Sequence, residues 1–166
     1  MQPFEHWYTW KDVASQSFAF SFATVNPDGT PHVTPIGSLI LDKDEPKGLY
    51  FQIFTSQMTR NLEHNHRVCI LAINNSKWFL LRSILSRKFD APPGVRLSGT
   101  VGEKRIATED EIQALKESLG LMGKFFKPGA GGFNIKYVRE IYFDSVKPVT
   151  IGKLTAHLPV EKESHR

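Results

Sequence analysis

Residues 51–68 read Phe51-Gln-Ile-Phe-Thr-Ser-Gln-Met-Thr-Arg-Asn-Leu-Glu-His-Asn-His-Arg-Val68. The pattern predicts a strand that ends in a hydroxyl-rich turn, followed by a short helix over 58–64 with Ser56 as its N-cap. Free N–H groups at a helix start, the helix dipole, hydroxyls and a guanidinium together suit an anion. An ordinary capped helix with a solvated arginine explains the segment equally well. The candidate phosphate contacts are Thr55, Ser56, Thr59 and Arg60.

Strands are expected on both sides of this segment. Phe18, Phe20 and Phe22 alternate with small residues, and the turn 26–29 (Asn-Pro-Asp-Gly) follows them, so 33–41 reads as the returning strand of a hairpin. Short strands joined by close turns favour an antiparallel barrel of six or seven strands. The further expected strands are 48–54, 68–73, 78–85, 95–105 and 137–149.

Helices are expected at two further places. Thr108 and Glu111 have the spacing of a capping box, and the helix that they open carries a buried stripe of Ile112, Leu115 and Leu119. Residues 10–15 form a possible short helix. The fold class is therefore mainly β, with a few short helices. We expect a single domain over 1–166, with its core at about 10–150 and a mobile tail from 159.

Composition narrows the class of protein. The chain has 166 residues, 40% of them hydrophobic and 23% charged, which is typical of a globular domain. The net charge is +4, and the lysines and arginines are scattered apart from a short patch at Arg82 to Lys88, whereas nucleic-acid binding usually needs a concentrated basic face. No apolar run approaches the length of a membrane span, and residues 1–10 show no secretion signal. With Cys69 as its one cysteine, we expect a cytoplasmic protein with neither nucleic-acid nor membrane partners.

Common catalytic and metal-binding motifs are missing from the sequence. The glycine-rich stretch 129–132 lacks the Lys-Ser/Thr of a phosphate loop, so 127–132 is interpreted as a connecting loop. His64 and His66 have no further ligands at metal-binding spacing. No Gly-x-Ser-x-Gly elbow is present. We therefore expect no metal site and no side chain that acts as a catalytic acid, base or nucleophile.

Three segments together point to a known family. Residues 22–37 (Phe22-Ala-Thr-Val-Asn-Pro-Asp-Gly-Thr-Pro-His-Val-Thr-Pro-Ile-Gly37) look like an opening hairpin. Residues 49–68 look like a strand, phosphate turn and helix that end in an Asn-x-Arg-Val signature. Residues 95–101 (Val95-Arg-Leu-Ser-Gly-Thr-Val101) look like a later strand. In these segments the chain resembles the pyridoxamine 5′-phosphate oxidase-like, FMN-binding split-barrel superfamily.

The resemblance implies an antiparallel split barrel that holds FMN at the interface of a homodimer. The flavin ring would lie along Thr34, Pro35, Ile36 and Gly37, where the small glycine permits close approach. The ribityl chain and the phosphate would follow Gln52, Phe54, Thr55 and Ser56. The resemblance further implies an FMN-dependent oxidoreductase of the flavin reductase kind, with a small-molecule or nicotinamide electron donor.

The sequence departs from the family at the phosphate cations. Met58, also counted among the expected cofactor-binding residues, stands where the family often has a lysine, and Thr34 and Leu39 stand where the true oxidases have an arginine and a lysine. Arg60 is the expected replacement, together with Arg82 or Arg96. The same differences argue against oxidation of vitamin B6. Residues 147–166 also lack the arginine and histidine pattern with which the oxidases bind their substrate.

Two alternatives stay open at this point. The barrel could hold another cofactor, a deazaflavin or haem, which related barrels accept. It could also be a binding or sensing module that carries FMN without turnover, or an empty barrel that acts only in assembly.

Overall fold

The computed structural model describes residues 7–53, 55–120 and 135–158. The expected loop at 127–132, the expected tail from 159 and the site residue Phe54 lie outside these ranges. No helix among the described residues is long and apolar enough to cross a membrane. The strands are β1 (Phe20–Val25), β2 (Pro31–Ile36), β3 (Leu39–Leu41), β4 (Lys47–Phe51), β5 (Arg67–Ile73), β6 (Gly94–Val101), β7 (Arg105–Ile106) and β8 (Tyr137–Pro148). The helices are α1 (Trp7–Ser15), α2 (Ser56–His64), α3 (Lys77–Ser86), α4 (Glu109–Ser118) and α5 (Gly152–Thr155).

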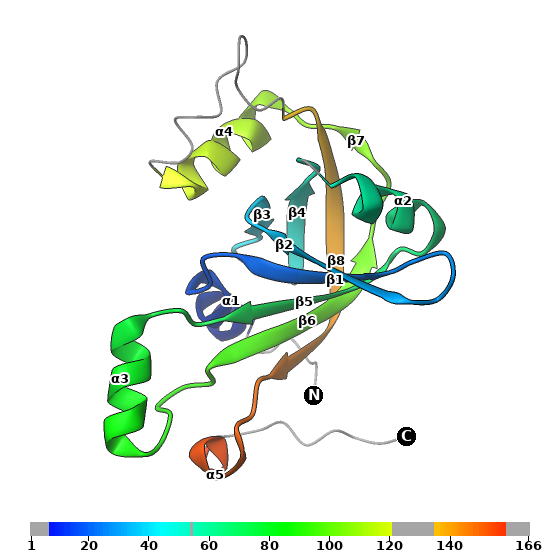
Figure 1. Ribbon diagram of the computed structural model, residues 1–166. Helices are drawn as coiled ribbons and strands as arrows, with labels where there is room; N and C mark the ends of the chain where they lie inside the picture. Colours follow the sequence, from blue (N-terminus) through cyan, green and yellow to red (C-terminus); the bar gives the residue numbers. More distant parts are fainter. Residues whose placement is uncertain (1–6, 54, 121–134, 159–166) are drawn as a thin grey trace.

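All strand pairs in the described residues are antiparallel, which confirms the predicted mainly β fold. The sheet has the order β2-β1-β5-β6-β8-β4-β3, and β7 also pairs with β8. The long strand β8 connects the two parts of this sheet. Its first half pairs with β4, from Phe51↔Val138 to Lys47↔Tyr142, and its second half pairs with β6, from Val101↔Ile141 to Val95↔Pro148. Figure 1 shows β8 running past both groups of strands.

Two hydrophobic clusters stabilise the sheet. The larger one lies among α1, α2 and the central strands, and Phe22 and Tyr50 pack there with ring centroids 5.2 Å apart. The smaller one lies under α4 and includes Phe51, Leu115 and Val138. Leu49 and Ile53 also pack against the smaller cluster, so Leu49, Phe51 and Ile53 share one face. The alternating side chains of β4 therefore stabilise both clusters.

The hairpin, the central strand and the capped helix were correctly predicted. β1 and β2 pair from Phe20↔Ile36 to Val25↔Pro31, although β1 begins after Phe18, which is exposed. β5 lies between β1 and β6, as expected for 68–73. The Thr108 side chain accepts from the Glu111 N–H and the Glu111 side chain accepts from the Thr108 N–H, so the capping box is confirmed.

The prediction of a strand at 78–85 is wrong, because these residues belong to α3. The Ser76 side chain caps this helix by accepting from the Phe79 N–H at 3.4 Å, and Phe79 packs on Phe89 with centroids 5.5 Å apart. The apolar residues of 78–85, interrupted by Arg82 and Ser83, carry no two-residue period. The cap and the aromatic contact therefore decide the conformation.

Two expected strands are each divided in the structure and one is the helix α3, so the described residues form eight strands where six or seven were expected. The strand at 33–41 divides into β2 and β3 because the chain leaves β1 after Ile36 and joins β4. At the crossing, the Phe51 N–H donates to Ser38 O at 2.9 Å and Ser38 Oγ donates to Phe51 O at 2.7 Å. The strand at 95–105 divides into β6 and β7 because the Gly102 N–H donates to Glu140 O between them.

Three element boundaries also differ from expectation. α1 begins at Trp7 rather than at residue 10, because Trp7 stacks on Phe143 and its Nε1–H donates to Asp42 O at 3.1 Å. α2 begins at Ser56 rather than at residue 58, so Thr55 and not Ser56 is its N-cap residue. β4 ends at Phe51 rather than at residue 54, since its pairing with β8 stops at Phe51↔Val138.

A bulge between β6 and β8 requires a glycine. Ser98 pairs with Ser145 and Gly99 pairs with Phe143, so Asp144 is the extra residue of β8. A Cβ atom on Gly99 would lie 2.2 Å from Tyr142 O. Only glycine, which has no Cβ, allows the two strands to approach this closely.

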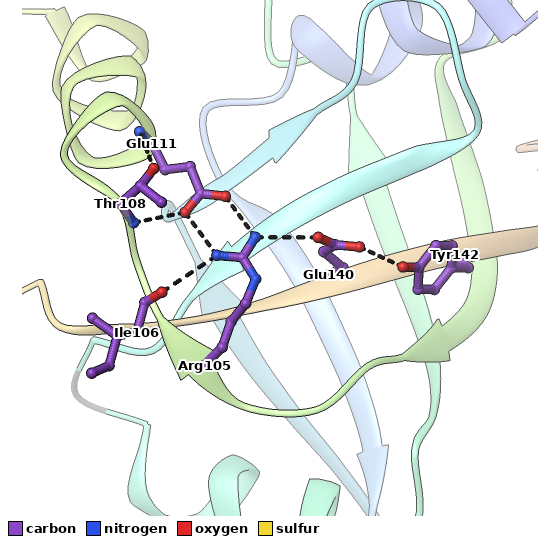
Figure 2. Close-up of polar contacts among 6 residues, drawn as sticks. All are labelled: Arg105, Ile106, Thr108, Glu111, Glu140 and Tyr142. Atoms are coloured by element: carbon purple, nitrogen blue, oxygen red, sulfur yellow. Dashed lines mark hydrogen bonds and ion pairs between the residues drawn. The ribbon is translucent and has the colours of Figure 1, made fainter.

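An ion-pair cluster joins β7, α4 and β8, as Figure 2 shows. The Arg105 guanidinium donates to both carboxylate oxygens of Glu111, at 2.9 and 2.6 Å, and to Glu140 at 3.2 Å. Glu140 also accepts from the Tyr142 hydroxyl. Arg105 lowers the pKa of Glu111 to about 2, chiefly through these hydrogen bonds. The cluster fixes α4 to the sheet next to its capping box.

We expect Glu111→Gln to lower the free energy of unfolding by about 1 kcal/mol at neutral pH. The effect is small because the Arg105 side chain is more than one third exposed and water screens the pair. Since the folded-state pKa of Glu111 lies below its ordinary 4.5, its contribution is complete above pH 4.5 and is lost as the pH falls towards 2. Urea unfolding at a series of pH values should show the two proteins converging below pH 4.5.

Glu109→Gln is the matched control, because Glu109 lies in the same first turn of α4 without a hydrogen bond to Arg105. Both substitutions remove one charge from the start of the helix. An equal pH dependence for the two variants would contradict a special contribution of the Arg105–Glu111 pair.

Candidate functional site

The turn between β4 and α2 leaves the start of α2 uncapped. The hydroxyls of Tyr50 and Thr55 are 2.5 Å apart, and Thr55 makes no side-chain capping bond to the helix. Burial of Tyr50 raises the pKa of its phenol to about 12, so the phenol stays protonated and can donate to Thr55. The Thr55 hydroxyl proton is then available to a ligand.

Three backbone donors lie at this helix start. The first helical bond runs from the Thr59 N–H to Thr55 O at 2.9 Å. The N–H groups of Ser56, Gln57 and Met58 make no hydrogen bond to any other described residue. Such groups, together with the helix dipole, form a favourable position for an anion.

Two of the predicted phosphate contacts are exposed and two are partly enclosed. Ser56 and Arg60 lie on the solvent side of α2. The Thr59 hydroxyl donates to Thr55 O at 2.7 Å and accepts from Gln52 Nε2 at 3.2 Å, so its hydrogen bonds are made within the turn. Thr59 is therefore placed to stabilise the turn rather than to meet a ligand.

Met58 was predicted as a site residue, but its side chain lies in the core and is almost fully buried. The apolar stripe of α2 needs this position for packing against the sheet. Only the backbone N–H of Met58 can therefore contribute to binding. The family lysine at this position has no side-chain counterpart in this chain.

A hydrogen-bonded network, which the sequence analysis missed, orients Arg60. Its Nη2 donates to Gln57 Oε1 at 2.6 Å, and Gln57 Nε2 donates to Asn61 Oδ1 at 2.9 Å. Asn61 is fully buried, and its Nδ2 donates to Thr24 Oγ1 at 3.0 Å and to Asn26 Oδ1 at 2.9 Å. An asparagine on the buried stripe of a helix was the signal in the sequence, since a buried amide needs partners.

The network joins α2 to the first hairpin. Asn26 Oδ1 also accepts from Gln57 Nε2 at 3.2 Å, and Asn26 Nδ2 donates to Thr30 Oγ1 at 2.9 Å within the turn. The guanidinium of Arg60 is thus connected through two amide side chains to β1 and its turn. This reduces the freedom that an exposed arginine would otherwise have to give up on binding.

The predicted ring segment lies on β2 and at its end. β2 pairs only with β1 among the described residues, and its prolines Pro31 and Pro35 suit such an edge strand. Thr34 Oγ1 and His32 Nε2 are 2.8 Å apart, and Pro35 is exposed. The Ile36 side chain is buried in the core, so this residue could meet a ligand only through its backbone.

The structure brings the ring segment and the phosphate turn together. Ser38 is bonded to Phe51 through two hydrogen bonds, so Gly37 and Gln52, the next residues on each side, are neighbours. Apart from Gly37 itself and its two chain neighbours, no described residue has an atom within 4 Å of the position that a Cβ on Gly37 would take. An exposed, open glycine therefore lies beside the start of the anion-binding turn.

These donors fit the phosphate and ring of FMN. N–H groups that have no partner among the described residues, the Ser56 hydroxyl and the oriented Arg60 suit a phosphate, and the space at Gly37 allows a flat ring to approach the backbone. Within the described residues, no three His, Cys, Asp or Glu side chains form a group that could hold a metal ion. The surroundings of Phe54 are not described.

Solved structures of similar fold were found with low sequence identity. An FMN-binding protein from Syntrophomonas wolfei subsp. wolfei has a TM-score of 0.61 and 12% identity, with 87% of this chain and 85% of that chain covered. An F420 reductase has a TM-score of 0.59 and 18% identity, with 82% and 94% covered. The haem storage protein HutZ from Vibrio cholerae has a TM-score of 0.55 and 14% identity, with 89% and 95% covered.

These similarities show the fold, an antiparallel split barrel. None of the curated proteins compared with the chain matches it. The sequence model of the family described as pyridoxamine 5′-phosphate oxidase matches residues 9–122, which is more than half of the chain. Its match includes both hairpin strands, the turn before α2, and β5 and β6. The chain therefore belongs to the pyridoxamine 5′-phosphate oxidase family.

Proposed function

We propose that this protein binds FMN as a homodimer and acts as an oxidoreductase of the flavin reductase kind. The observation that carries the proposal is the uncapped start of α2 beside an arginine that Gln57 and Asn61 orient. The family match and the FMN-binding protein of similar fold support it. In the proposal, a nicotinamide or another small molecule delivers the electrons.

In the proposal, different residues bind the phosphate and the ring of FMN. The N–H groups of Ser56, Gln57 and Met58 and the guanidinium of Arg60 bind the phosphate, and the open backbone at Gly37 receives the ring edge. FMN supplies hydride and single-electron transfer when it is bound. The chain's own residues orient it and shield one face, and no acid or base is required. Because β2 is an edge strand, a second copy of the chain covers the site in this proposal.

We expect Arg60→Ala to weaken FMN binding about tenfold to a hundredfold. A hydrogen bond to a charged group contributes about 1.5–3 kcal/mol, and here the guanidinium is held in place before the ligand arrives. The measurement is a fluorescence titration of flavin-free protein with FMN, after the absorption spectrum of the isolated protein has been recorded. Arg60→Lys keeps the charge but loses the planar contact, so its affinity for FMN should lie between those of the wild type and Arg60→Ala.

Arg82→Ala is the matched control, because Arg82 lies on α3 and pairs with Asp90 at 3.0 Å. If Arg82→Ala weakened FMN binding and Arg60→Ala did not, Arg82 and not Arg60 would bind the phosphate, and our assignment would be wrong. A Soret band, a bound deazaflavin, or a protein that ignores added FMN would contradict FMN itself. A flavin-loaded monomer in light scattering would contradict the homodimer.

A further inference from the structure

The helix α3 presents an apolar face to solvent. The side chains of Trp78, Ile84 and Leu85 are 75%, 73% and 76% exposed, and Leu81 is also exposed. Ser83 and Phe79 lie on the opposite side, where Ser83 Oγ donates to Phe79 O at 2.7 Å and Phe79 packs on Phe89. A helix of a soluble domain normally buries its apolar side. Here that side is turned outward and needs a partner.

Cations surround this apolar face. Residues 77–90 contain Lys77, Arg82, Arg87 and Lys88, all exposed, and Asp90, which pairs with Arg82, is their only acidic residue. Trp78, Leu81, Arg82, Leu85 and Ser86 line an open groove of about 470 Å³. An apolar strip bordered by lysines and arginines, with a tryptophan at its edge, has the chemistry of a helix that lies on an anionic lipid surface.

A second element extends the same end of the molecule. α5 is bonded to the chain that follows α3, because the Phe89 N–H donates to Leu154 O at 3.0 Å. Ile151 and Leu154 are exposed there, and Lys153 adds another exposed cation. Figure 1 shows α3 and α5 together at one end, whereas α2 and α4 lie at the other. The membrane-facing end would therefore leave the candidate FMN site accessible.

We propose that the α3 surface, formed by Trp78, Leu81, Arg82, Ile84, Leu85 and Lys88, docks the protein on a bilayer that carries anionic lipids. A second copy of the chain is a poorer occupant. A two-fold contact centred on α3 would bring the same cations of both copies together, and like charges repel. Such peripheral binding needs no membrane-spanning segment. The expectation of no membrane partner rested on the lack of such a segment in the sequence, so it did not consider binding of this kind.

The test uses vesicles of phosphatidylcholine, with and without about one quarter phosphatidylglycerol. The full chain should float with the anionic vesicles, and binding should decrease at high salt because the cations are then screened. Trp78 supplies a built-in probe, since the other two tryptophans of the chain, Trp7 and Trp10, are buried. We expect a blue shift of the tryptophan emission on binding to anionic vesicles only.

The double variant Ile84→Asp/Leu85→Asp should lose about tenfold or more of the vesicle binding, because two exposed apolar side chains no longer enter the lipid. Ile106→Asp is the matched control, since Ile106 is 67% exposed on β7 at a distance in the sequence from α3. Equal thermal unfolding of the variants and the wild type establishes that they fold. The control should bind as the wild type does.

Three results would overturn the proposal. The first is a lack of binding to anionic vesicles, or equal binding to neutral ones. The second is an equal loss of binding in Ile106→Asp. The third is a change of oligomeric state in the double variant, which would identify the α3 surface as a contact between copies. None of these results depends on FMN, so the docking surface and the proposed function can fail separately.

Discussion

Gly99→Ala is expected to lower the free energy of unfolding by about 3 kcal/mol or more, a large part of the stability of a typical domain. The added Cβ would lie 2.2 Å from Tyr142 O and 2.9 Å from the Cα of Phe143, both backbone atoms of β8. No rotamer relieves a backbone contact, so the strands must separate at the bulge. Urea unfolding of the variant and the wild type, followed by circular dichroism, measures the loss.

Gly37→Ala is the matched control for this prediction. Beyond its chain neighbours, no described residue lies within 4 Å of a Cβ at Gly37, so the added methyl group meets none of them. We expect its free energy of unfolding to stay within about 0.5 kcal/mol of the wild type. If both glycine variants were equally stable, the strands at the bulge would be able to separate without cost, and the close approach of β6 and β8 would have no structural importance.

Asn61→Leu is expected to lower the free energy of unfolding by about 2–4 kcal/mol. Leucine has a similar volume but leaves the Thr24 hydroxyl, the Asn26 oxygen and the Gln57 amide with fewer partners, and each buried group left unpaired costs about 1–3 kcal/mol. FMN binding should also weaken, because Gln57 no longer holds Arg60 firmly. Urea unfolding and FMN titration of the same preparation measure the two effects.

Asn75→Leu supplies the comparison, since Asn75 is exposed and its side chain makes no hydrogen bond to a described residue. Replacing this asparagine by leucine should leave the free energy of unfolding nearly unchanged. Unchanged stability of Asn61→Leu would show that the network contributes nothing to the fold. Lost stability with unchanged FMN affinity would show that Gln57 orients Arg60 without its hydrogen bond to Asn61.

The parts of the fold that follow from local signals were predictable. The period of two around Phe20 and Phe22 and the turn 26–29 place the first hairpin, and Thr108 with Glu111 places the start of α4 to the residue. In each case the signal and the structure that it specifies lie within a few residues of one another. The mainly β class follows from the number of such strands and turns.

The parts that depend on distant contacts were not predictable. Residues 33–41 look like one strand because nothing local shows that Ser38 leaves β1 and bonds to Phe51. In α3 the inward side carries Phe79 and the polar Ser83, whereas most of its apolar residues face solvent, so the sequence does not show which side packs on the domain. Thr55 rather than Ser56 is the N-cap residue, and its hydroxyl meets Tyr50 in place of the helix.

The candidate site was predictable in its chain segments and less so in its details. The resemblance to the family implied that Gly37 and Gln52 belong to one site, and the Ser38–Phe51 bonds make them neighbours. It did not show that the side chains of Met58 and Ile36 are needed in the core. It also missed Asn61, whose importance comes from partners more than thirty residues away. Contact of these residues with FMN remains a prediction.

The position of β8 governs how the protein can form during translation. The sheet needs this strand beside both β4 and β6, yet β8 begins only at Tyr137. While the ribosome is still adding residues, β4 and β6 each present an edge without its partner, and such edges can associate with other chains. These two edges of the nascent polypeptide are therefore open to association with other chains until β8 has emerged.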